Sequence, residues 1–340
     1  MFTNIFNKNI IYILVSLLLL LAATGCGGNE QAGVNDSDTD RVYRIGVTQF
    51  VDHPALNLDQ QGFLDQMKLE GYIEGENILY DIQNSQGDHN LAKTIADKFV
   101  ADKVDAIFAI TTPSSQAAAM ATKGTDIPVV FIAVSDAVGS GLIQANDKAT
   151  GTNITGVYSA DPVEQQMDLI GEFIPDIKQL GFIYNAGEAN SVSNINRAKE
   201  YVESKGWNVV EVSVASSNEV QAAAQSLAGR VDAVFVPQDN TVISALEALL
   251  KELQDKNVPL FTGDTESVRR GAVATVGNDE YDCGAQGATM LARILKGEKA
   301  GEIVPEEIRK RTLMINKTAA QNINLAIPQS VLDRADEIVE

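Results

Sequence analysis

Short apolar runs alternate with amphipathic stretches along the chain from residue 42 onwards. Between the apolar runs, hydrophobic residues recur at helical spacing, as at 58–70, where Phe63, Leu64 and Met67 share one face and Gly71 ends the pattern. Strands that alternate with helices predict βα units on a parallel sheet. The expected strands of the first half lie at 43–47, 78–82, 106–110, 129–133 and 154–158.

The second half of the chain repeats the first in outline. The sequence KVDAIF at 103–108 is echoed by RVDAVF at 230–235, and IPVVF at 127–131 is echoed by VPLF at 258–261. A third pair joins 45–47 to 180–182. One such pair is no more than chance similarity between βα units, but three pairs in the same order predict two similarly wound lobes.

The C-terminal part of the chain is expected to serve both lobes. Residues 271–340 supply a strand at 273–276, a helix from about 279 to 295, a strand at 312–315 and a last helix from Pro328. We therefore expect an α/β fold with two similar doubly wound parallel-sheet lobes, joined by a hinge of several crossovers near 155–160. The expected lobes are 42–157 with about 280–305, and 158–279 with about 306–340.

The first 25 residues differ from the rest of the chain. Residues 10–23 are almost unbroken hydrocarbon, too short for a spanning helix, and small residues follow, which predicts a secretory signal peptide. The sequence ATGC at 23–26 resembles a bacterial lipobox, although Ala23 stands where leucine is commoner, and this makes Cys26 the expected lipidation site. Residues 26–41 are predicted to form a flexible tether. An uncleaved anchor is the alternative, and either arrangement places the body outside the cytoplasm.

Composition narrows the classes of function. The 46 acidic residues outnumber the 26 basic ones, and the net charge of -20 disfavours binding to nucleic acid or to anionic lipid. Two His and two Cys are too few for a zinc or iron-sulfur site, so no metal is expected. If Cys26 is acylated, Cys283 is the one thiol left, and we expect it to be a packed side chain because no His or second Cys lies nearby in sequence.

The loops that follow the predicted strands are rich in hydroxyls, amides and carboxylates. Ligands bind at this edge of parallel sheets, where helix N-termini offer free N–H groups. The segment TTPSSQ at 111–116 could hold a small carboxylate in this way, and Asp239 and Asp264 could hold an ammonium across the cleft. Both acids could instead simply cap the helices that follow. No loop carries a glycine-rich phosphate motif, so no nucleotide or other cofactor is expected.

Several of these motifs together resemble the tryptophan/tyrosine-type ABC transporter substrate-binding lipoproteins. The resemblance runs from about residue 43 to the C-terminus. It implies a type I periplasmic-binding fold that closes on a ligand and delivers it to an ABC permease and its ATPase, with an aromatic amino acid as the expected cargo. The motifs that carry it lie at 49–54, 83–88, 108–113, 128–131, 155–157, 237–245 and 263–265.

The resemblance also assigns roles to residues at matching positions. It implies that Thr112, Ser114 and Ser115 meet the ligand carboxylate and that Asp264 meets the ammonium. The other wall residues it implies are Gln49, His53, Asn185, Asp239 and Asn240. Four aromatic residues near strand ends could stack on a ring or could pack in the core or hinge, namely Phe50, Tyr158, Tyr184 and Tyr281.

These observations predict an extracytoplasmic, lipid-anchored solute receptor that acts as a monomer. A binding module that senses a ligand for a surface receptor would share every one of these features, and the solute could be something other than an amino acid. An enzyme is not expected, because the strand-end loops hold no His-Cys pair, no metal cluster and no phosphate motif.

Overall fold

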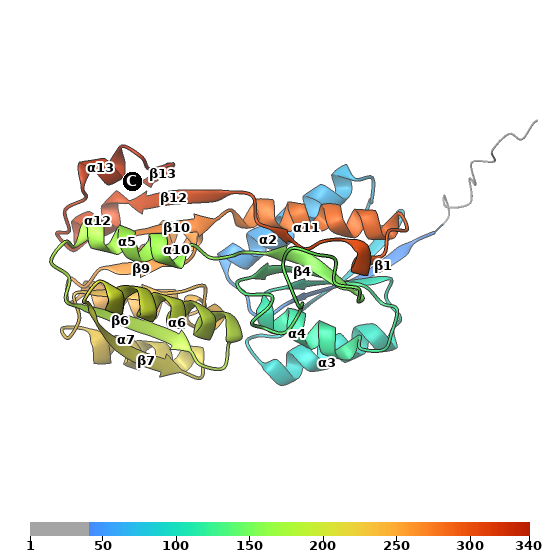
Figure 1. Ribbon diagram of the computed structural model, residues 1–340, viewed down its shortest axis with the longest axis horizontal. Helices are drawn as coiled ribbons and strands as arrows, with labels where there is room; N and C mark the ends of the chain where they lie inside the picture. Colours follow the sequence, from blue (N-terminus) through green and yellow to red (C-terminus); the bar gives the residue numbers. More distant parts are fainter. Residues whose placement is uncertain (1–40) are drawn as a thin grey trace, which may run out of the picture. The chain divides into compact units, whose positions relative to one another are not determined.

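The computed structural model describes residues 41–340, and Val42–Glu340 form one compact unit (Figure 1). The predicted signal peptide, the lipidation site Cys26 and all of the predicted tether except Arg41 lie outside the described residues. Within 41–340, no helix is long and apolar enough to cross a membrane.

The first lobe is built on a six-stranded sheet in the order β11-β5-β4-β3-β1-β2, in which every pairing is parallel. Its helices lie on both faces of this sheet (Figure 1). The strands are β1 (Tyr43–Gln49), β2 (Ile78–Asn84), β3 (Ala106–Ile110), β4 (Val129–Val134), β5 (Ile154–Tyr158) and β11 (Glu306–Glu307). The helices are α2 (Pro54–Leu69), α3 (His89–Ala101), α4 (Thr112–Ala121), α11 (Glu280–Leu295) and the short η2 (Ala300–Glu302).

The second lobe is built on a seven-stranded sheet in the order β13-β12-β10-β9-β8-β6-β7. Its strands are β6 (Gln179–Asn185), β7 (Asn208–Val214), β8 (Ala233–Val236), β9 (Leu260–Thr262), β10 (Ala274–Asn278), β12 (Arg311–Asn316) and β13 (Glu337–Val339). Its helices are α5 (Val163–Phe173), α6 (Ala189–Ser204), η1 (Ser217–Glu219), α7 (Val220–Leu227), α8 (Asn240–Ile243), α9 (Leu246–Gln254), α10 (Thr265–Arg270), α12 (Lys317–Asn322) and α13 (Gln329–Leu332).

The two lobes share one winding order, which confirms the predicted fold class. Strands β2-β1-β3-β4-β5 of the first sheet correspond to β7-β6-β8-β9-β10 of the second. The three sequence echoes therefore fall on equivalent strands, β1 with β6, β3 with β8 and β4 with β9. One strand departs from the prediction of purely parallel sheets, because β12 pairs antiparallel with β10 after the chain returns from the first lobe.

The chain crosses between the lobes three times, after β5, after β10 and after β11. Strand β11 pairs with β5 at Glu306 and Val157, so the first lobe continues to Glu307, slightly beyond the boundary expected near 305. The preceding crossover leaves β10 at Asn278 and enters α11 at Glu280. The tail thus adds a helix and a strand to the first lobe before it completes the second.

Each sheet is packed on both faces by its own hydrophobic side chains. In the first lobe, Phe63 on α2 stacks on Phe108 of β3 with ring centroids 3.9 Å apart. Cys283 is buried in the same cluster, as expected for a packed thiol, and Trp207 packs against the core of the second lobe. Because these cores lie wholly within 42–340, this part of the chain is expected to fold by itself.

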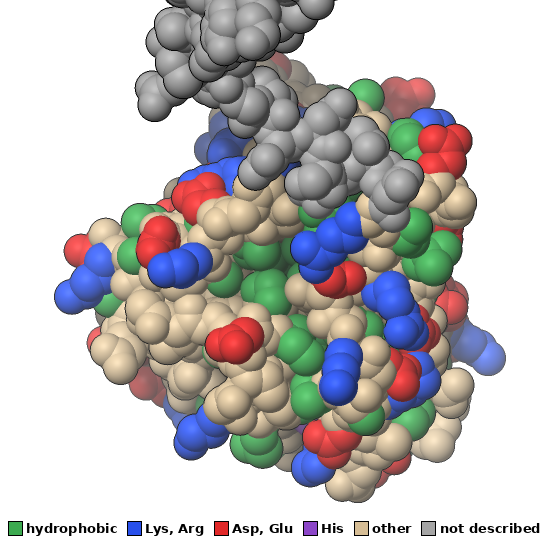
Figure 2. Space-filling view, turned by 90° about the vertical axis from the view of Figure 1, so that its right-hand side faces the viewer, with side chains coloured by type: hydrophobic (Ala, Val, Ile, Leu, Met, Phe, Trp, Pro, Cys, Tyr) green, Lys and Arg blue, Asp and Glu red, His purple; other side chains and the backbone are tan. Residues whose placement is uncertain are grey.

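The surface carries charges of both signs. On the face in Figure 2, the acidic and basic side chains of the described residues are interspersed among small hydrophobic groups. Many of these charges form exposed ion pairs, such as Lys93 with Asp97 and Lys98 with Asp102. Exposed pairs of this kind contribute little to stability, about 0.2–1 kcal/mol each.

Candidate functional site

A cavity lies between the two lobes at the carboxyl ends of their strands. Its polar lining includes His53, Asp59, Thr111 and Ser135 from 42–157, Glu280 from α11, and Asn190, Gln238, Asn240 and Asp264 from the second lobe. The lining of the cavity is largely buried, since Asp59 is 0%, Asp264 1% and Glu280 5% exposed. A ligand the size of an amino acid can therefore enter only when the lobes separate.

One end of the cavity is the N-terminus of α4. Thr111 precedes the helix with φ +84°, a conformation that is uncommon for a β-branched residue, and its side chain lines the cavity. The hydroxyls of Thr111, Thr112 and Ser114 are buried and have no hydrogen-bond partner among residues 41–340. Free helix N–H groups beside unsatisfied hydroxyls form a site for a small anion.

The three predicted hydroxyl residues of this turn differ in what they do. Thr112, Ser114 and Ser115 are all buried in the first turn of α4, but none of them lines the cavity. The Ser115 hydroxyl donates to the carbonyl of Thr111 at 2.6 Å and so stabilises the turn. The residue of this segment that reaches the cavity is Thr111, which the sequence comparison did not single out.

Asp264 lines the cavity and also caps α10. Its Oδ1 accepts a hydrogen bond from the Ser267 N–H and its Oδ2 from the Ser267 hydroxyl, each at 2.7 Å. Burial raises the pKa of the Asp264 carboxyl. Each carboxylate oxygen keeps a lone pair free for a ligand, so the capping role and a binding role are compatible here.

Asp239 has the structural role that sequence analysis left open. It caps α8 through the Val242 N–H at 2.8 Å and accepts the Asn185 N–H at 2.6 Å, and it does not line the cavity. Burial, with the nearby Glu188 charge, raises its pKa to about 7. Both of its oxygens therefore accept hydrogen bonds from the loops behind the cavity wall, as expected of the capping role.

Asn185 and Asn240 belong to the same network of buried hydrogen bonds around the start of α8. The Asn185 amide donates to the Thr241 hydroxyl at 2.8 Å, while the Asn240 amide donates to buried Glu188 at 2.5 Å. Asn240 lines the cavity and Asn185 does not. Glu188 accepts further hydrogen bonds from Thr241, so it holds the start of α8 in place.

The two predicted site residues near β1 also differ in role. Gln49 donates to the Val51 carbonyl at 2.8 Å and to the Asn57 side chain at 3.1 Å, so it shapes the loop before α2 and does not line the cavity. His53 does line it. Burial, helped by the charge of Arg270, lowers the pKa of His53 to about 4, so its ring is neutral at physiological pH.

None of the four aromatic candidates for a stacking wall lines the cavity. Phe50 is buried and packs on the His89 ring, with centroids 4.9 Å apart. Tyr184 donates to Glu211 at 3.2 Å, and Tyr281 is 42% exposed and donates to Asp65. Tyr158 packs against the core of the first lobe. The apolar lining of the cavity consists instead of Ala55, Leu56, Ala133 and Ile243.

Sequence analysis did not name Asp59 or Glu280 as site residues, although Glu280 lies in the loop that follows a predicted strand, and both acids line the cavity. Asp59 lies on the buried face of α2, between Leu56 and Phe63, and is fully buried. An acid inside an apolar helical stripe was the available signal. With Asp264, these side chains place three carboxyl groups around a cavity that no Lys or Arg of residues 41–340 lines, which favours a ligand with a positive group.

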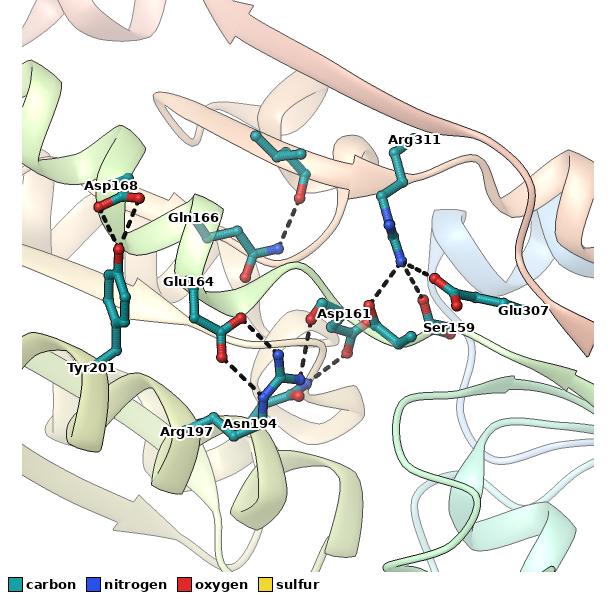
Figure 3. A network of polar contacts seen from close by, with 12 residues as sticks. Ser159, Asp161, Glu164, Gln166, Asp168, Asn194, Arg197, Tyr201, Glu307 and Arg311 are labelled. Atoms are coloured by element: carbon teal, nitrogen blue, oxygen red, sulfur yellow. Dashed lines mark hydrogen bonds and ion pairs between the residues drawn. The ribbon is translucent and has the colours of Figure 1, made fainter. Parts of the chain in front are cut away.

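Polar contacts join the lobes beside the cavity and at the hinge (Figure 3). The Arg311 guanidinium donates to the carbonyls of Ser159 and Ala160 at 3.3 and 2.9 Å, and pairs with Glu307 at 2.7 Å. Ala160 has φ +43°, which marks a sharp bend where the chain leaves β5. These contacts fix the two crossovers to each other.

The lobes also touch through α6. The Ser193 hydroxyl donates to Asp136 of the first lobe at 3.0 Å, and Asn194 approaches Ser135 at 3.5 Å. The Asn194 amide also binds buried Asp161 at 2.6 Å (Figure 3). Among residues 41–340, no group of His, Cys, Asp and Glu is arranged to hold a metal ion.

Known proteins resemble this chain over nearly all of the described unit. A family model described as ABC transporter substrate binding protein matches residues 44–339. A tyrosine-binding protein of Clostridioides difficile is 32% identical over 323 residues, which cover 94% of this chain and 93% of that protein.

Two solved structures add a comparison of conformations. An ABC domain from Streptococcus pneumoniae in complex with L-Trp is 34% identical, covers 88% of this chain and 100% of its own, and has a TM-score of 0.83. A ligand-free, open substrate-binding protein with adhesive properties from Clostridium difficile is 35% identical, covers 88% and 99%, and has a TM-score of 0.65.

Proposed function

This chain belongs to the family of ABC transporter substrate-binding proteins, and from that premise we propose that it is a receptor that closes two lobes on an aromatic amino acid. The observation that carries the proposal is the largely buried cavity between the lobes, with unsatisfied hydroxyls at one end and carboxyl groups near it. The zwitterion of an amino acid needs hydrogen-bond donors for its carboxylate and acidic groups for its ammonium.

Closure of the lobes is supported by two independent observations. The cavity lining is almost completely buried, so access requires the hinge to open. At nearly equal identity, the chain also superposes better on the L-Trp complex than on the ligand-free, open structure. Binding then shifts the population of the closed state, because only that state brings both lobes onto the ligand.

The carboxylate of the ligand is proposed to bind at the start of α4. The helix N-terminus carries about half a positive charge, which compensates for the missing Lys or Arg. Thr111, with Thr112 and Ser114 behind it, supplies hydroxyl donors that have no other partner among the described residues. Asp264 is proposed to face the ammonium from the second lobe, as the sequence comparison implied.

The aromatic class of the ligand is inferred from relatives and not from a ring-lined pocket. The similar proteins bind tyrosine in one case and L-Trp in another, according to their names. In this chain, Leu56 and Ile243 offer apolar contacts to a side chain. We propose L-tyrosine, L-tryptophan or L-phenylalanine as the ligand.

The cellular role is proposed from the family and from the N-terminal sequence. The expected lipidation at Cys26 would hold the body at the outer surface of the cell membrane, and the tether would let it reach an ABC permease driven by an ATPase. We propose that it acts there as a monomer, because each lobe must remain free to meet one half of the permease.

A thermal-shift screen of residues 41–340 tests the proposal. The panel contains the twenty amino acids, small peptides, nucleosides and sugars. A ligand at a hundred times its dissociation constant should stabilise the protein by about 2.7 kcal/mol. A selective shift with Tyr, Trp or Phe supports the proposal. A shift with sugars or nucleosides alone would keep the receptor and reject the aromatic amino acid.

A receptor that senses its ligand for a surface kinase is the second candidate, since the same clamp would serve it. Capture of partners from solubilised membranes with ligand-loaded protein separates the two roles. Recovery of a permease and its ATPase supports import, whereas recovery of a kinase alone would support sensing.

A further inference from the structure

The helices α2 and α11 approach each other unusually closely beside the cavity. A Cβ atom placed on Gly284 of α11 would lie 1.9 Å from the Asp59 carbonyl oxygen, and one on Gly62 of α2 would lie 2.0 Å from the Tyr281 carbonyl oxygen. Only glycine fits at such contacts. Because they lack a side chain, Gly62 and Gly284 allow close backbone contact between the helix turns that carry Asp59 and Glu280.

Asp59 is a buried acid whose carboxyl group lacks a strong hydrogen-bond donor among the described residues. Its side chain is 0% exposed and lines the cavity, yet neither carboxyl oxygen accepts a hydrogen bond within ordinary geometry from residues 41–340. The nearby Cys283 thiol is only a weak donor. A buried carboxyl without a strong hydrogen-bond donor is costly for a fold.

Glu280 lines the same cavity from the first turn of α11. Its Oε1 accepts a long hydrogen bond of 3.4 Å from Gln238 of the second lobe. The negative field of Asp59 acts on Glu280, and so does that of Asp264. The titratable and charged groups that face this pair are Asp279 and Cys283 on α11, Asp264 and Arg270 on and beside α10, Asp161 at the hinge, and His53 before α2.

We propose that Asp59 and Glu280 together form the ammonium site of the cavity, with Asp59 as the principal contact and Asp264 as the group that closes over it. This inference rests on the proposed function and deepens it, because it specifies a ligand with a primary amine. A cation placed between the two acids supplies the hydrogen-bond donors that Asp59 lacks and balances charges that otherwise repel each other.

The site predicts that binding releases protons. Burial raises the pKa of both the Asp59 and the Glu280 carboxyl well above their ordinary values, with repulsion from neighbouring acids adding to it. The raised pKa values favour protonated carboxyls in the ligand-free protein, and an incoming ammonium favours their ionised form, so we expect binding to release protons. Affinity for the amine must then rise with pH across the range in which these carboxyls ionise.

Isothermal titration calorimetry of residues 41–340 tests the site with three probes, L-tyrosine, tyramine and 3-(4-hydroxyphenyl)propanoate, which has no amine. We expect Asp59→Asn to weaken the binding of L-tyrosine by about 30-fold or more, since it removes the principal charged partner of the buried ammonium. The affinity for the amine-free probe should change less than threefold in Asp59→Asn. Titrations in buffers of different ionisation enthalpy should show proton release in the wild type and less of it in Asp59→Asn and Glu280→Gln.

Asp65→Asn is the matched control, because Asp65 lies on the same helix and joins α2 to α11 through the Tyr281 hydroxyl on the outer side. It should leave affinity and proton release unchanged. Equal losses in Asp65→Asn and Asp59→Asn would overturn the proposal, since they would report only helix packing.

The outcomes separate this inference from the proposed function. If the wild type binds L-tyrosine and Asp59→Asn leaves both affinity and proton release intact, the ammonium site is wrong and the receptor stands. If the wild type instead binds a non-aromatic amine from the wider amino-acid panel and loses it in Asp59→Asn, the site stands and the aromatic class is wrong. If no amine binds at all, both are wrong.

Discussion

On the proposed account, individual acidic residues of the cavity serve ligand binding at the expense of stability. Asp59, Asp264 and Glu280 are buried, and burial raises the pKa of each carboxyl. A core of the same volume without these charges would be at least as stable. The acids are therefore best understood as groups kept for a ligand, and their cost should be measurable in the ligand-free protein.

The first prediction concerns stability and pH. Because the folded-state pKa of Asp59 exceeds the ordinary value of 3.8, its protonated form stabilises the fold at low pH and this stability is lost as pH rises through the raised pKa. Ligand-free Asp59→Asn should unfold like the wild type at a pH below 3.8, where Asp59 is protonated in both the folded and the unfolded state, and should be more stable than the wild type near pH 8 by about 1–4 kcal/mol.

Urea unfolding at both pH values measures this difference. Comparison with the wild type cancels the opposite contribution of His53, whose lowered pKa of about 4 makes the fold lose stability as pH falls below the ordinary value of 6.5. A variant less stable than the wild type at pH 8 would contradict the account.

The second prediction separates the two roles of Asp264. The change Asp264→Asn keeps an oxygen that can accept the Ser267 N–H, whereas Asp264→Ala removes the cap of α10. We expect Asp264→Asn to change stability little and to weaken the binding of L-tyrosine. The variant Asp264→Ala should weaken binding too and should also lose about 1 kcal/mol of stability. Chemical denaturation paired with calorimetry distinguishes them. Full affinity in Asp264→Asn would restrict this residue to capping.

Sequence reasoning at this scale found part of the cavity. His53, Asn240 and Asp264 were predicted and do line it, because each follows a strand whose position was clear from the apolar pattern. Asp59 lies inside α2, where strand-end logic does not look. Glu280 is the first residue of α11, directly after β10, so it lies in a strand-end loop but was not singled out there. The direction of an aromatic ring depends on packing from distant elements, so Tyr184 and Tyr281 could not be placed from their position in the chain.

At the scale of elements, the pair α2 and α11 determines the shape of the acidic end of the cavity. The helices come from opposite ends of the chain, and their contact depends on Gly62 and Gly284. No sequence pattern within either helix predicts that contact. The strands were easier to predict, since β3 is buried throughout and β1 and β4 are buried at all but one position each. The antiparallel direction of β12 follows from a crossover that local sequence does not encode.

The third prediction is that Gly284→Ala destabilises the protein. The added methyl would meet the Asp59 carbonyl, which belongs to a backbone that cannot move away cheaply. A loss of about 1–3 kcal/mol is expected, together with weaker binding, because the two acids would be pushed apart.

The control is Gly171→Ala in α5, where the nearest atom to the added carbon is a Trp207 ring atom at 3.1 Å. Since alanine favours helices over glycine by up to about 1 kcal/mol, this change should be close to neutral. Urea midpoints compare the two variants. Equal effects would mean that the close approach of α2 and α11 is unimportant.

At the scale of the whole described unit, two similar lobes are held together by few contacts. The duplicated strand order was predictable from the three sequence echoes, as was the passage of the C-terminal part through both lobes. The conformation of the hinge was not, because it depends on how Arg311 reaches the carbonyls of Ser159 and Ala160 from a distant part of the chain.

The fourth prediction concerns closure. Ser193→Ala removes the hydrogen bond from α6 to Asp136 across the lobes. Since such a bond is worth about 0.5–1.5 kcal/mol, L-tyrosine should bind about 2- to 10-fold more weakly and dissociate faster. Small-angle X-ray scattering should show a larger radius of gyration for the ligand-free variant.

Ser204→Ala on the same helix is the control, because the Ser204 hydroxyl binds the Tyr201 carbonyl within α6. It should match the wild type in scattering and affinity. If Ser193→Ala also matches the wild type in both measurements, α6 plays no part in closing the lobes.

A crystal structure of residues 41–340 grown with L-tyrosine or L-tryptophan tests the central claim most directly. The account predicts closed lobes that enclose the amino acid, with its carboxylate at the start of α4 near Thr111 and its ammonium within hydrogen-bond distance of Asp59. An empty cavity between closed lobes, or a ligand bound outside the cleft, would contradict it.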